Sequence, residues 1–371
     1  MLTEKSKKLY LKNIKSSISN IAKYIPGESD NKKNIKLSSN ESPFLIPKKI
    51  RDIASKNVQT SNQYPDGDSL ILKKSISKKF RINPDQIICG NGSDDILSLI
   101  GLAFTQENCE VICSQYSFLY YPIIAHSVGA RVVFAKTKKL NISPKNIIEK
   151  INQNTKVIFI ANPNNPTGLV LFKNELIEML KKIPKDIIVV IDGAYAEFVL
   201  DKNFSDGLDL VKTFPNIIVT RTFSKVFAMA GFRIGWGYSS KEIIETLEKI
   251  RGPFNVNTFA QVSASLILKD KRFLKKSISH NFKWRAWLIE QINGLGLKAF
   301  ESFTNFILIK NKLQKISAKK IVLELKKKGV YVRDLDNYDL KNYFRISIGK
   351  ENELRKLIKE LKFIIKKYEK K

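Results

Sequence analysis

The sequence predicts an α/β protein that has a large domain, with a mostly parallel sheet covered by helices, and a smaller α+β domain. Between about residues 85 and 240, short β-rich apolar runs alternate with segments of helical period, which is typical of such a sheet. Beyond Trp236, two long helical stretches lead into a βαββα order. With 371 residues, 43% of them hydrophobic, the chain is long enough to bury more than one core.

The apolar periodicity places the individual elements. Strands of the large domain are expected at residues 86–89, 110–113, 131–135, 156–161, 186–191 and 216–220, with helices at 94–104, 121–128, 144–151 and 173–182. Beyond them, helices are expected at 240–251, 259–293 and 321–328, and strands at 299–310, 330–333 and 344–348. We predict three parts: residues 1–45 as an N-terminal arm and part of the small domain, 46–255 as the large domain, and 256–371 as the C-terminal small domain.

The basic charge of the chain does not indicate nucleic-acid binding. The net charge is +30, and clustered basic faces attract phosphate backbones. However, 54 lysines and 11 arginines are scattered along the whole chain, without a helix-turn-helix, zinc-finger or RNP-type motif. We therefore expect a compositional bias that fills solvated positions with lysine, and no nucleic-acid partner.

Cysteine usage and hydropathy predict a cytoplasmic protein without metal or membrane partners. The three cysteines have no disulfide-framework spacing, and the two histidines lie far from them, so we expect reduced core thiols and no metal site. The N-terminus has no apolar stretch of the length that a signal peptide needs, and no run of about 18 apolar residues, as a membrane span requires, occurs in the sequence. The apolar stripe through residues 354–364 is typical of a helix on a membrane surface or, more often, of one packed on its own domain.

Lys225 is the strongest candidate for chemistry. It follows a β-branched strand, where its amine would be partly desolvated and close to cations, so that its pKa falls and the neutral amine can attack an aldehyde. Thr222 and Ser224 place hydroxyls beside it, and Arg233 offers a planar fork for a phosphate. A Ser-Lys pair before a helix also occurs by chance, so this segment alone leaves both interpretations open.

Other polar positions lie at the ends of the expected strands. Asp192 directly follows an apolar strand, where it could pair with a protonated pyridine nitrogen or merely cap a helix, and Tyr195 follows it. The Pro-rich turn 162–168 fixes Asn165, unless it is an ordinary turn. The glycine-rich turn 90–95, before a helix, could bind an anion. Together these are the parts that a pyridoxal 5′-phosphate (PLP) site needs.

The order of these motifs resembles that of the fold-type-I PLP aminotransferases, and most closely that of the histidinol-phosphate aminotransferase family. The resemblance runs over nearly the whole chain. Besides the motifs above, it includes residues 24–27, 37–43, 62–66, 251–256, 304–306, 332–334 and 344–349. One departure is Gly193, where the family usually has a glutamate that is not a cofactor ligand.

The resemblance implies a role for each matching residue. Lys225 would hold the cofactor as a Schiff base, Asp192 would pair with the pyridine nitrogen, and Tyr195 and Asn165 would bind the ring oxygen. Phe118 would stack on the ring, with Tyr116 as the alternative. The phosphate would be held by Gly92, Ser93, Asp94, Thr222, Ser224, Arg233 and, from the other subunit, Tyr64. The anionic substrate would be held by Tyr24, Asn40, Arg333 and Arg345.

The resemblance further implies a homodimeric enzyme that transfers an amino group between glutamate and imidazole-acetol phosphate in histidine biosynthesis. An aminotransferase for aromatic or other amino acids, or a threonine-phosphate decarboxylase, would share the fold, and fold alone does not separate these activities. A transcriptional regulator on a PLP-binding fold is the alternative from another class. It would need an N-terminal DNA-binding domain, whereas fewer than 90 residues precede the expected core.

Overall fold

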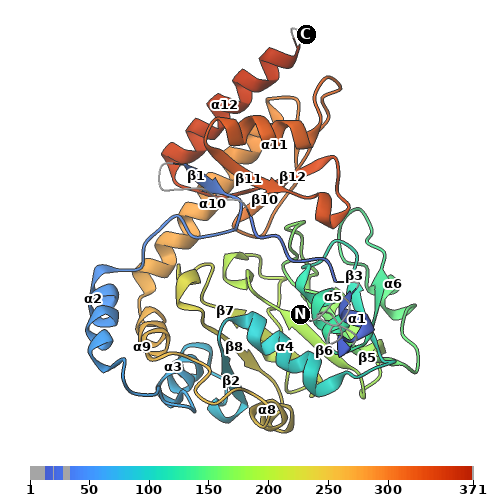
Figure 1. The fold of residues 1–371 in the computed structure, drawn as a ribbon, viewed down its shortest axis with the longest axis vertical. Helices are drawn as coiled ribbons and strands as arrows, with labels where there is room; N and C mark the ends of the chain where they lie inside the picture. Colours follow the sequence, from blue (N-terminus) through green and yellow to red (C-terminus); the bar gives the residue numbers. More distant parts are fainter. Residues whose placement is uncertain (1–12, 20, 28–33, 370–371) are drawn as a thin grey trace, which may run out of the picture.

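The strands of the chain form two separate sheets (Figure 1). This computed structural model describes residues 13–19, 21–27 and 34–369. The larger sheet has the strand order β2-β8-β7-β6-β5-β3-β4, and the smaller one has the order β1-β11-β12-β10-β9. The predicted α/β class is therefore confirmed. Within the described residues, no helix is long and apolar enough to cross a membrane.

The larger sheet is parallel except at one strand. Its strands are β2 (Ile87–Gly90), β3 (Glu110–Ser114), β4 (Arg131–Ala135), β5 (Thr155–Ala161), β6 (Ile188–Asp192), β7 (Ile217–Thr222) and β8 (Gly235–Tyr238). β8 runs antiparallel to both of its neighbours, β2 and β7. The sequence did not reveal β8, because two of its four residues are glycines, which weaken the strand signal. Gly235 is needed there: a Cβ atom would lie 2.3 Å from the backbone nitrogen of Ser93.

Helices cover both faces of this sheet, so its central strands read as continuous apolar runs. The helices that pack on this sheet include α4 (Ser93–Phe104), α5 (Tyr120–Ser127), α6 (Pro144–Ile148), α7 (Lys173–Lys182) and α8 (Lys241–Glu248). All six predicted strands and these five helices are present. Two further helices, α2 (Lys48–Lys56) and α3 (Leu70–Phe80), were not predicted; both pack against α9 (Thr258–Ile267).

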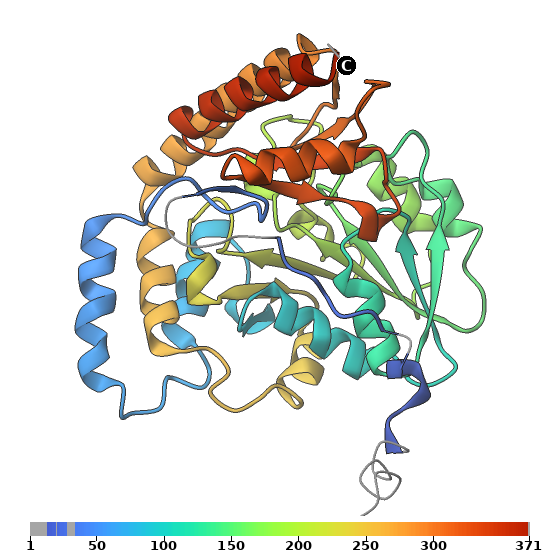
Figure 2. The same ribbon diagram turned by 45° about the horizontal axis from the view of Figure 1, so that its top comes forward.

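The smaller sheet combines an N-terminal strand with C-terminal ones. Its strands are β1 (Ile35–Leu37), β9 (Lys298–Ala299), β10 (Phe306–Lys310), β11 (Val330–Asp334) and β12 (Tyr343–Ser347), and β1 pairs in parallel with β11. It is accompanied by α10 (Lys271–Asn293), α11 (Ala318–Lys327) and α12 (Glu351–Glu369) (Figure 2). The apolar stripe of α12 is buried in this core, so the helix packs on its own domain.

Two expected elements are divided in the structure. The helical stretch predicted at 259–293 is α9 followed by α10, because the Asp270 side chain accepts a hydrogen bond from the Phe273 backbone and starts a new helix there. The strand predicted at 299–310 is β9 and β10, separated by residues 300–305. The three cysteines are free and buried, as predicted.

The predicted domain boundaries remain a proposal. Residues 1–12, 20 and 28–33 of the predicted arm lie outside the described residues. The apolar side chains of α9, including Ala260, Ala264 and Ile267, belong to the core of the larger sheet although they follow residue 255. Because Phe273 of α10 also lies in that core, whereas Trp284 of α10 belongs to the core of the smaller sheet, the packing favours a boundary within α10.

Candidate active site

A cavity of about 270 Å³ lies between the two sheets, at the carboxyl ends of β5, β6 and β7. Ligands of open α/β sheets bind at this edge. Fourteen of the sixteen predicted site residues line the cavity: Tyr24, Asn40, Ser93, Asp94, Phe118, Asn165, Asp192, Tyr195, Thr222, Ser224, Lys225, Arg233, Arg333 and Arg345. Gly92 and Tyr64 are not among the lining residues.

Asp192 ends β6 and lies at the floor of the cavity. Its carboxylate accepts hydrogen bonds from the Tyr121 hydroxyl at 2.7 Å, the Ala194 backbone nitrogen at 3.2 Å and the Thr220 hydroxyl at 3.3 Å. Burial raises the pKa of Asp192 to about 6, while the hydrogen bonds oppose this rise. The carboxylate is therefore held in one orientation and stays ionised at neutral pH, as a partner for a cationic group.

Tyr195 is buried and connects the large domain to the N-terminal segment. Its hydroxyl accepts a hydrogen bond from the Asn40 side chain at 2.9 Å. Asn40 has a positive φ of 55°, and its backbone nitrogen and side-chain oxygen both bond to the Ser347 hydroxyl of β12. Burial raises the pKa of Tyr195 to about 12, so its hydroxyl is a neutral donor across the physiological range.

Lys225 follows β7 and is partly buried. Its amine lies 3.5 Å from the backbone oxygen of Ser39 and 5.7 Å from the centre of the Tyr195 ring. Burial, and after it the charge of Arg345, lower the pKa of the Lys225 amine to about 8. A larger fraction of this amine than of an exposed lysine amine is therefore unprotonated at neutral pH, as the sequence predicted for a nucleophilic lysine.

The start of α4 and Arg233 form an anion-binding cup. Arg233 donates to Asp94 at 3.3 Å and to the Ser224 hydroxyl at 3.5 Å. Gly92 has a φ of 92°, which favours glycine, and a Cβ atom there would lie 2.5 Å from an Arg233 terminal nitrogen, so glycine lets the turn approach the guanidinium without strain. The free backbone donors and the dipole of α4 favour an anion here. These contacts place Gly92 at the cup although it does not line the cavity.

Arg333 and Arg345 form the opposite wall of the cavity. They are direct partners in the antiparallel pair of β11 and β12, and both are buried. Arg345 donates to the Asn165 side chain and to the Ser38 backbone oxygen, and its Nε has no partner among the described residues. Burial lowers the pKa of Arg345, and the neighbouring Arg333 adds to this effect. Two like charges side by side are destabilising unless they serve an anion.

The two aromatic candidates for stacking are separated by the fold. Phe118 lines the cavity, with its ring edge-on to Tyr121 at 5.7 Å, whereas Tyr116 packs beside Leu308 and Leu335 of the small domain. Tyr64 is 81% exposed and its ring stacks on that of Phe254 at 4.6 Å. Within one chain, Tyr64 therefore lies outside the cavity.

Several lining residues were missed by the sequence reasoning. They are Ser39, Glu41, Tyr121 and Tyr338, among others. Tyr121 was assigned only to an expected helix, and its bond to Asp192 joins residues 71 positions apart. Ser39 and Glu41 lie beside Asn40 in the segment 37–43, and this motif was the one available signal for them.

The residues that line the cavity fit the cofactor PLP. The Gly92 and Arg233 cup would hold its phosphate, the buried Asp192 carboxylate would face its ring nitrogen, and the Lys225 amine would reach its aldehyde. The fold and these side chains together are those of a PLP-dependent transferase. Residues 32–361 match the family described as "Aminotransferase class I and II". The chain belongs to this family and is an aminotransferase.

The chain is similar to several proteins of known sequence or structure. A histidinol-phosphate aminotransferase of Pelagibacter ubique is 40% identical over 98% of this chain and 99% of its own. The structure of the histidinol-phosphate aminotransferase of Clostridium acetobutylicum is 30% identical, with a TM-score of 0.82 over 89% of this chain and 99% of that one. The enzyme of Sinorhizobium meliloti, solved in complex with PLP, has a TM-score of 0.84 at 22% identity, covering 89% and 90% of the two chains.

Proposed function

We propose that this chain is a cytoplasmic, homodimeric enzyme that transfers an amino group between glutamate and imidazole-acetol phosphate, in histidine biosynthesis. The observation that carries the proposal is the pair of buried arginines, Arg333 and Arg345, facing a lysine whose amine has a lowered pKa. Both substrates are anions, so a fixed pair of guanidinium groups suits them. The Pelagibacter ubique and Clostridium acetobutylicum relatives are both named histidinol-phosphate aminotransferases, which supports this choice of substrate.

When bound, PLP supplies an aldehyde that takes up the amino group and a ring that draws electrons from the reacting bond. Lys225 can move a proton to and from the substrate carbon, because its amine has a pKa of about 8 and exchanges protons near neutral pH. Asp192 would hold a proton at the ring nitrogen, and Tyr195 and Asn165 would orient the ring through its oxygen. Phe118, which lines the cavity, would cover one face of the ring. Arg345, Arg333, Tyr24 and Asn40 bind and orient the substrate.

The experiment that tests the substrate is a steady-state comparison. Transamination with glutamate is measured against histidinol phosphate, phenylalanine, tyrosine and threonine phosphate. We expect histidinol phosphate to have the highest kcat/KM. A higher value for an aromatic amino acid would assign a different aminotransferase activity, and release of carbon dioxide from threonine phosphate would assign a decarboxylase.

The substitution Arg345→Lys tests the substrate clamp. Lysine keeps the charge but loses the planar fork that bonds to Asn165 and Ser38. We expect KM to rise for both glutamate and histidinol phosphate, with a loss of about 2–4 kcal/mol in kcat/KM. The cofactor's absorbance spectrum should remain unchanged. Normal kinetics with a lower melting temperature would mean that the arginine is structural.

The proposed dimer explains the position of Tyr64. Tyr64 is exposed, stacks on Phe254 and does not line the cavity of its own subunit. In a dimer, a twofold axis would bring each Tyr64 to the phosphate cup of the other subunit. Mixing Lys225→Ala with Tyr64→Phe subunits should therefore create hybrids in which one site carries both lesions and the other carries none. We expect activity above the sum of the two parent proteins, measured after subunit exchange. A fully active monomer in sedimentation would exclude the dimer.

A further inference from the structure

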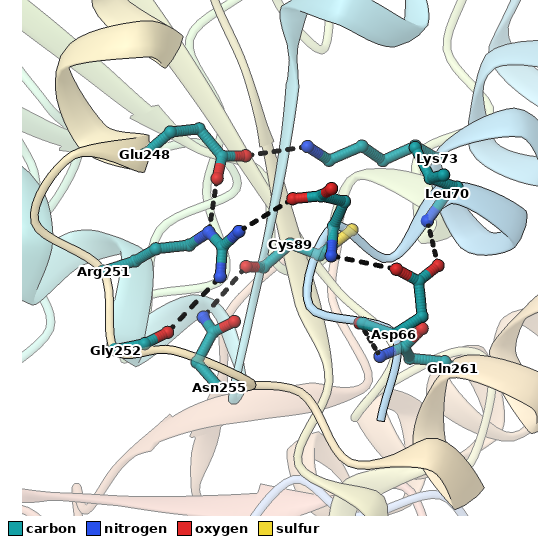
Figure 3. Close-up of polar contacts among 10 residues, drawn as sticks. Asp66, Leu70, Lys73, Cys89, Glu248, Arg251, Gly252, Asn255 and Gln261 are labelled. Atoms are coloured by element: carbon teal, nitrogen blue, oxygen red, sulfur yellow. Dashed lines mark hydrogen bonds and ion pairs between the residues drawn. The ribbon is translucent and has the colours of Figure 1, made fainter. Parts of the chain in front are cut away.

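The segment from Glu248 to Asn255 contacts two turns, residues 64–68 and residues 90–95 (Figure 3). The proposed function connects both turns with phosphate binding, because the first carries Tyr64 and the second forms the anion cup. Arg251 is 12% exposed and donates to the carboxylate of Glu248 and, at 3.3 Å, to Asp68. Lys73 of α3 donates to the same Glu248 at 2.7 Å. Two cations and two carboxylates thus alternate in one network, which fixes the turn that ends at Asp68 against the end of α8.

The same segment holds the turn at the start of α4. The Asn255 side-chain amide donates to the Cys89 backbone oxygen at 3.1 Å and to the Asp95 carboxylate at 3.1 Å. That carboxylate also accepts from the Asn91 backbone nitrogen at 2.9 Å. Asn255 therefore fixes both ends of the turn 90–95, whose backbone donors form the anion cup.

The turn that carries Tyr64 is held by contacts with Phe254 and with Gln261 of α9. Gln261 of α9 donates to the Asp66 backbone oxygen at 2.9 Å, and Asp66 in turn accepts from the Leu70 backbone nitrogen at 2.8 Å. The rings of Tyr64 and Phe254 are nearly parallel, with an interplanar angle of 16°. Tyr64 is thus exposed, yet its ring has a fixed support on the segment that follows Arg251.

We propose that Arg251 and Asn255 are positioning residues for the cofactor phosphate. Asn255 holds the anion cup of its own subunit, and Arg251 holds the Tyr64 turn that the dimer offers to the partner's cup. One segment thereby connects the phosphate sites of the two subunits. This inference rests on the proposed function, since it requires both PLP and the dimer.

The test compares two ligands that differ only in the phosphate. Apoenzyme is titrated with PLP and with pyridoxal, and binding is followed by absorbance, for the wild type and for Arg251→Met, Arg251→Lys and Asn255→Ala. We expect the Kd for PLP to rise about tenfold or more in Arg251→Met and Asn255→Ala, as for a lost hydrogen bond to a charged group. The Kd for pyridoxal should change little, and Arg251→Lys should be intermediate.

A matched control removes another arginine–carboxylate pair of the large domain. Arg131→Met breaks the contact of Arg131 with Glu110, 3.2 Å long, between β4 and β3, which lie away from the β2 edge of the sheet. It should leave both Kd values unchanged. If the Arg251 and Asn255 variants lose PLP and pyridoxal equally, or lose neither, the positioning role is wrong. If the wild type does not bind PLP, the proposed function itself fails.

Subunit exchange separates the two residues. In hybrids with Lys225→Ala, an Arg251→Met subunit keeps its own lysine and receives an intact Tyr64 turn, so one complete site forms. An Asn255→Ala subunit keeps its damaged cup beside its own lysine, so no complete site forms. We therefore expect tight PLP binding to return in the first hybrid and not in the second. The opposite pattern would overturn the assignment.

Discussion

Lys225→Ala is expected to abolish the visible absorbance band of the bound cofactor and to lower transamination by about 10³-fold or more. Among the described residues that line the cavity, Lys225 carries the one lysine amine that can form the covalent bond and then transfer the proton, and alanine removes both functions. A spectrum and an activity assay on the same preparation measure the two effects. Lys173→Ala, at an exposed pair with Asp209, is the matched control and should leave both unchanged.

The pH dependence of cofactor capture provides a second measurement at Lys225. Because burial lowers the pKa of the amine to about 8, its neutral form increases as the pH rises to 8 and is nearly complete above 9. The rate at which apoenzyme captures PLP should therefore rise and then level off in this range. A rate that still rises above pH 10 would mean that the amine is not desolvated. An unchanged spectrum in Lys225→Ala would contradict the central assignment.

Asp192→Asn is expected to leave PLP bound but to lower turnover by about 10²–10³-fold. Asparagine has the same shape, but it cannot balance the charge of a protonated ring nitrogen, and the loss of one partner of a buried ion pair costs about 3–5 kcal/mol. Stopped-flow measurement of the half-reaction with glutamate reports this step directly. Near-normal turnover would mean that another carboxylate faces the ring.

Tyr121→Phe tests Asp192 by a smaller change, which keeps the carboxylate but alters its pKa. It removes the 2.7 Å hydrogen bond that stabilises the ionised carboxylate, so the pKa of Asp192 should rise further above 6. Activity should then be normal at high pH and be lost at a higher pH than in the wild type as the solution is acidified. If the activity of both proteins did not depend on pH in this range, Asp192 would not be the group that holds the proton at the ring nitrogen.

The sequence located most of the site because the decisive side chains follow strands. Asp192 and Lys225 come after the buried runs of β6 and β7, and parallel strands bring their carboxyl ends to one edge. Arg333 and Arg345 were found through their motifs, and the register of β11 and β12 then explained why two arginines lie together. The strand β8 and the break between α9 and α10 were missed, because glycines and a single capping aspartate carry little periodic signal.

By itself, the sequence determined the fold class and most strands, and it singled out a lysine, an aspartate and a glycine-rich turn that the structure brings to one cavity. These features depend on periodicity and on the chemistry of neighbouring residues in the chain. Only the tertiary structure decided which residues support them. The hydrogen bond from Tyr121 to Asp192 joins residues 71 positions apart, and that from Asn40 to Tyr195 joins residues 155 positions apart. The hydrogen bonds from Asn255 to the turn before α4 span 160 or more positions. Local patterns do not encode such pairs, because a side chain's partner across that distance is fixed by the packing of whole elements.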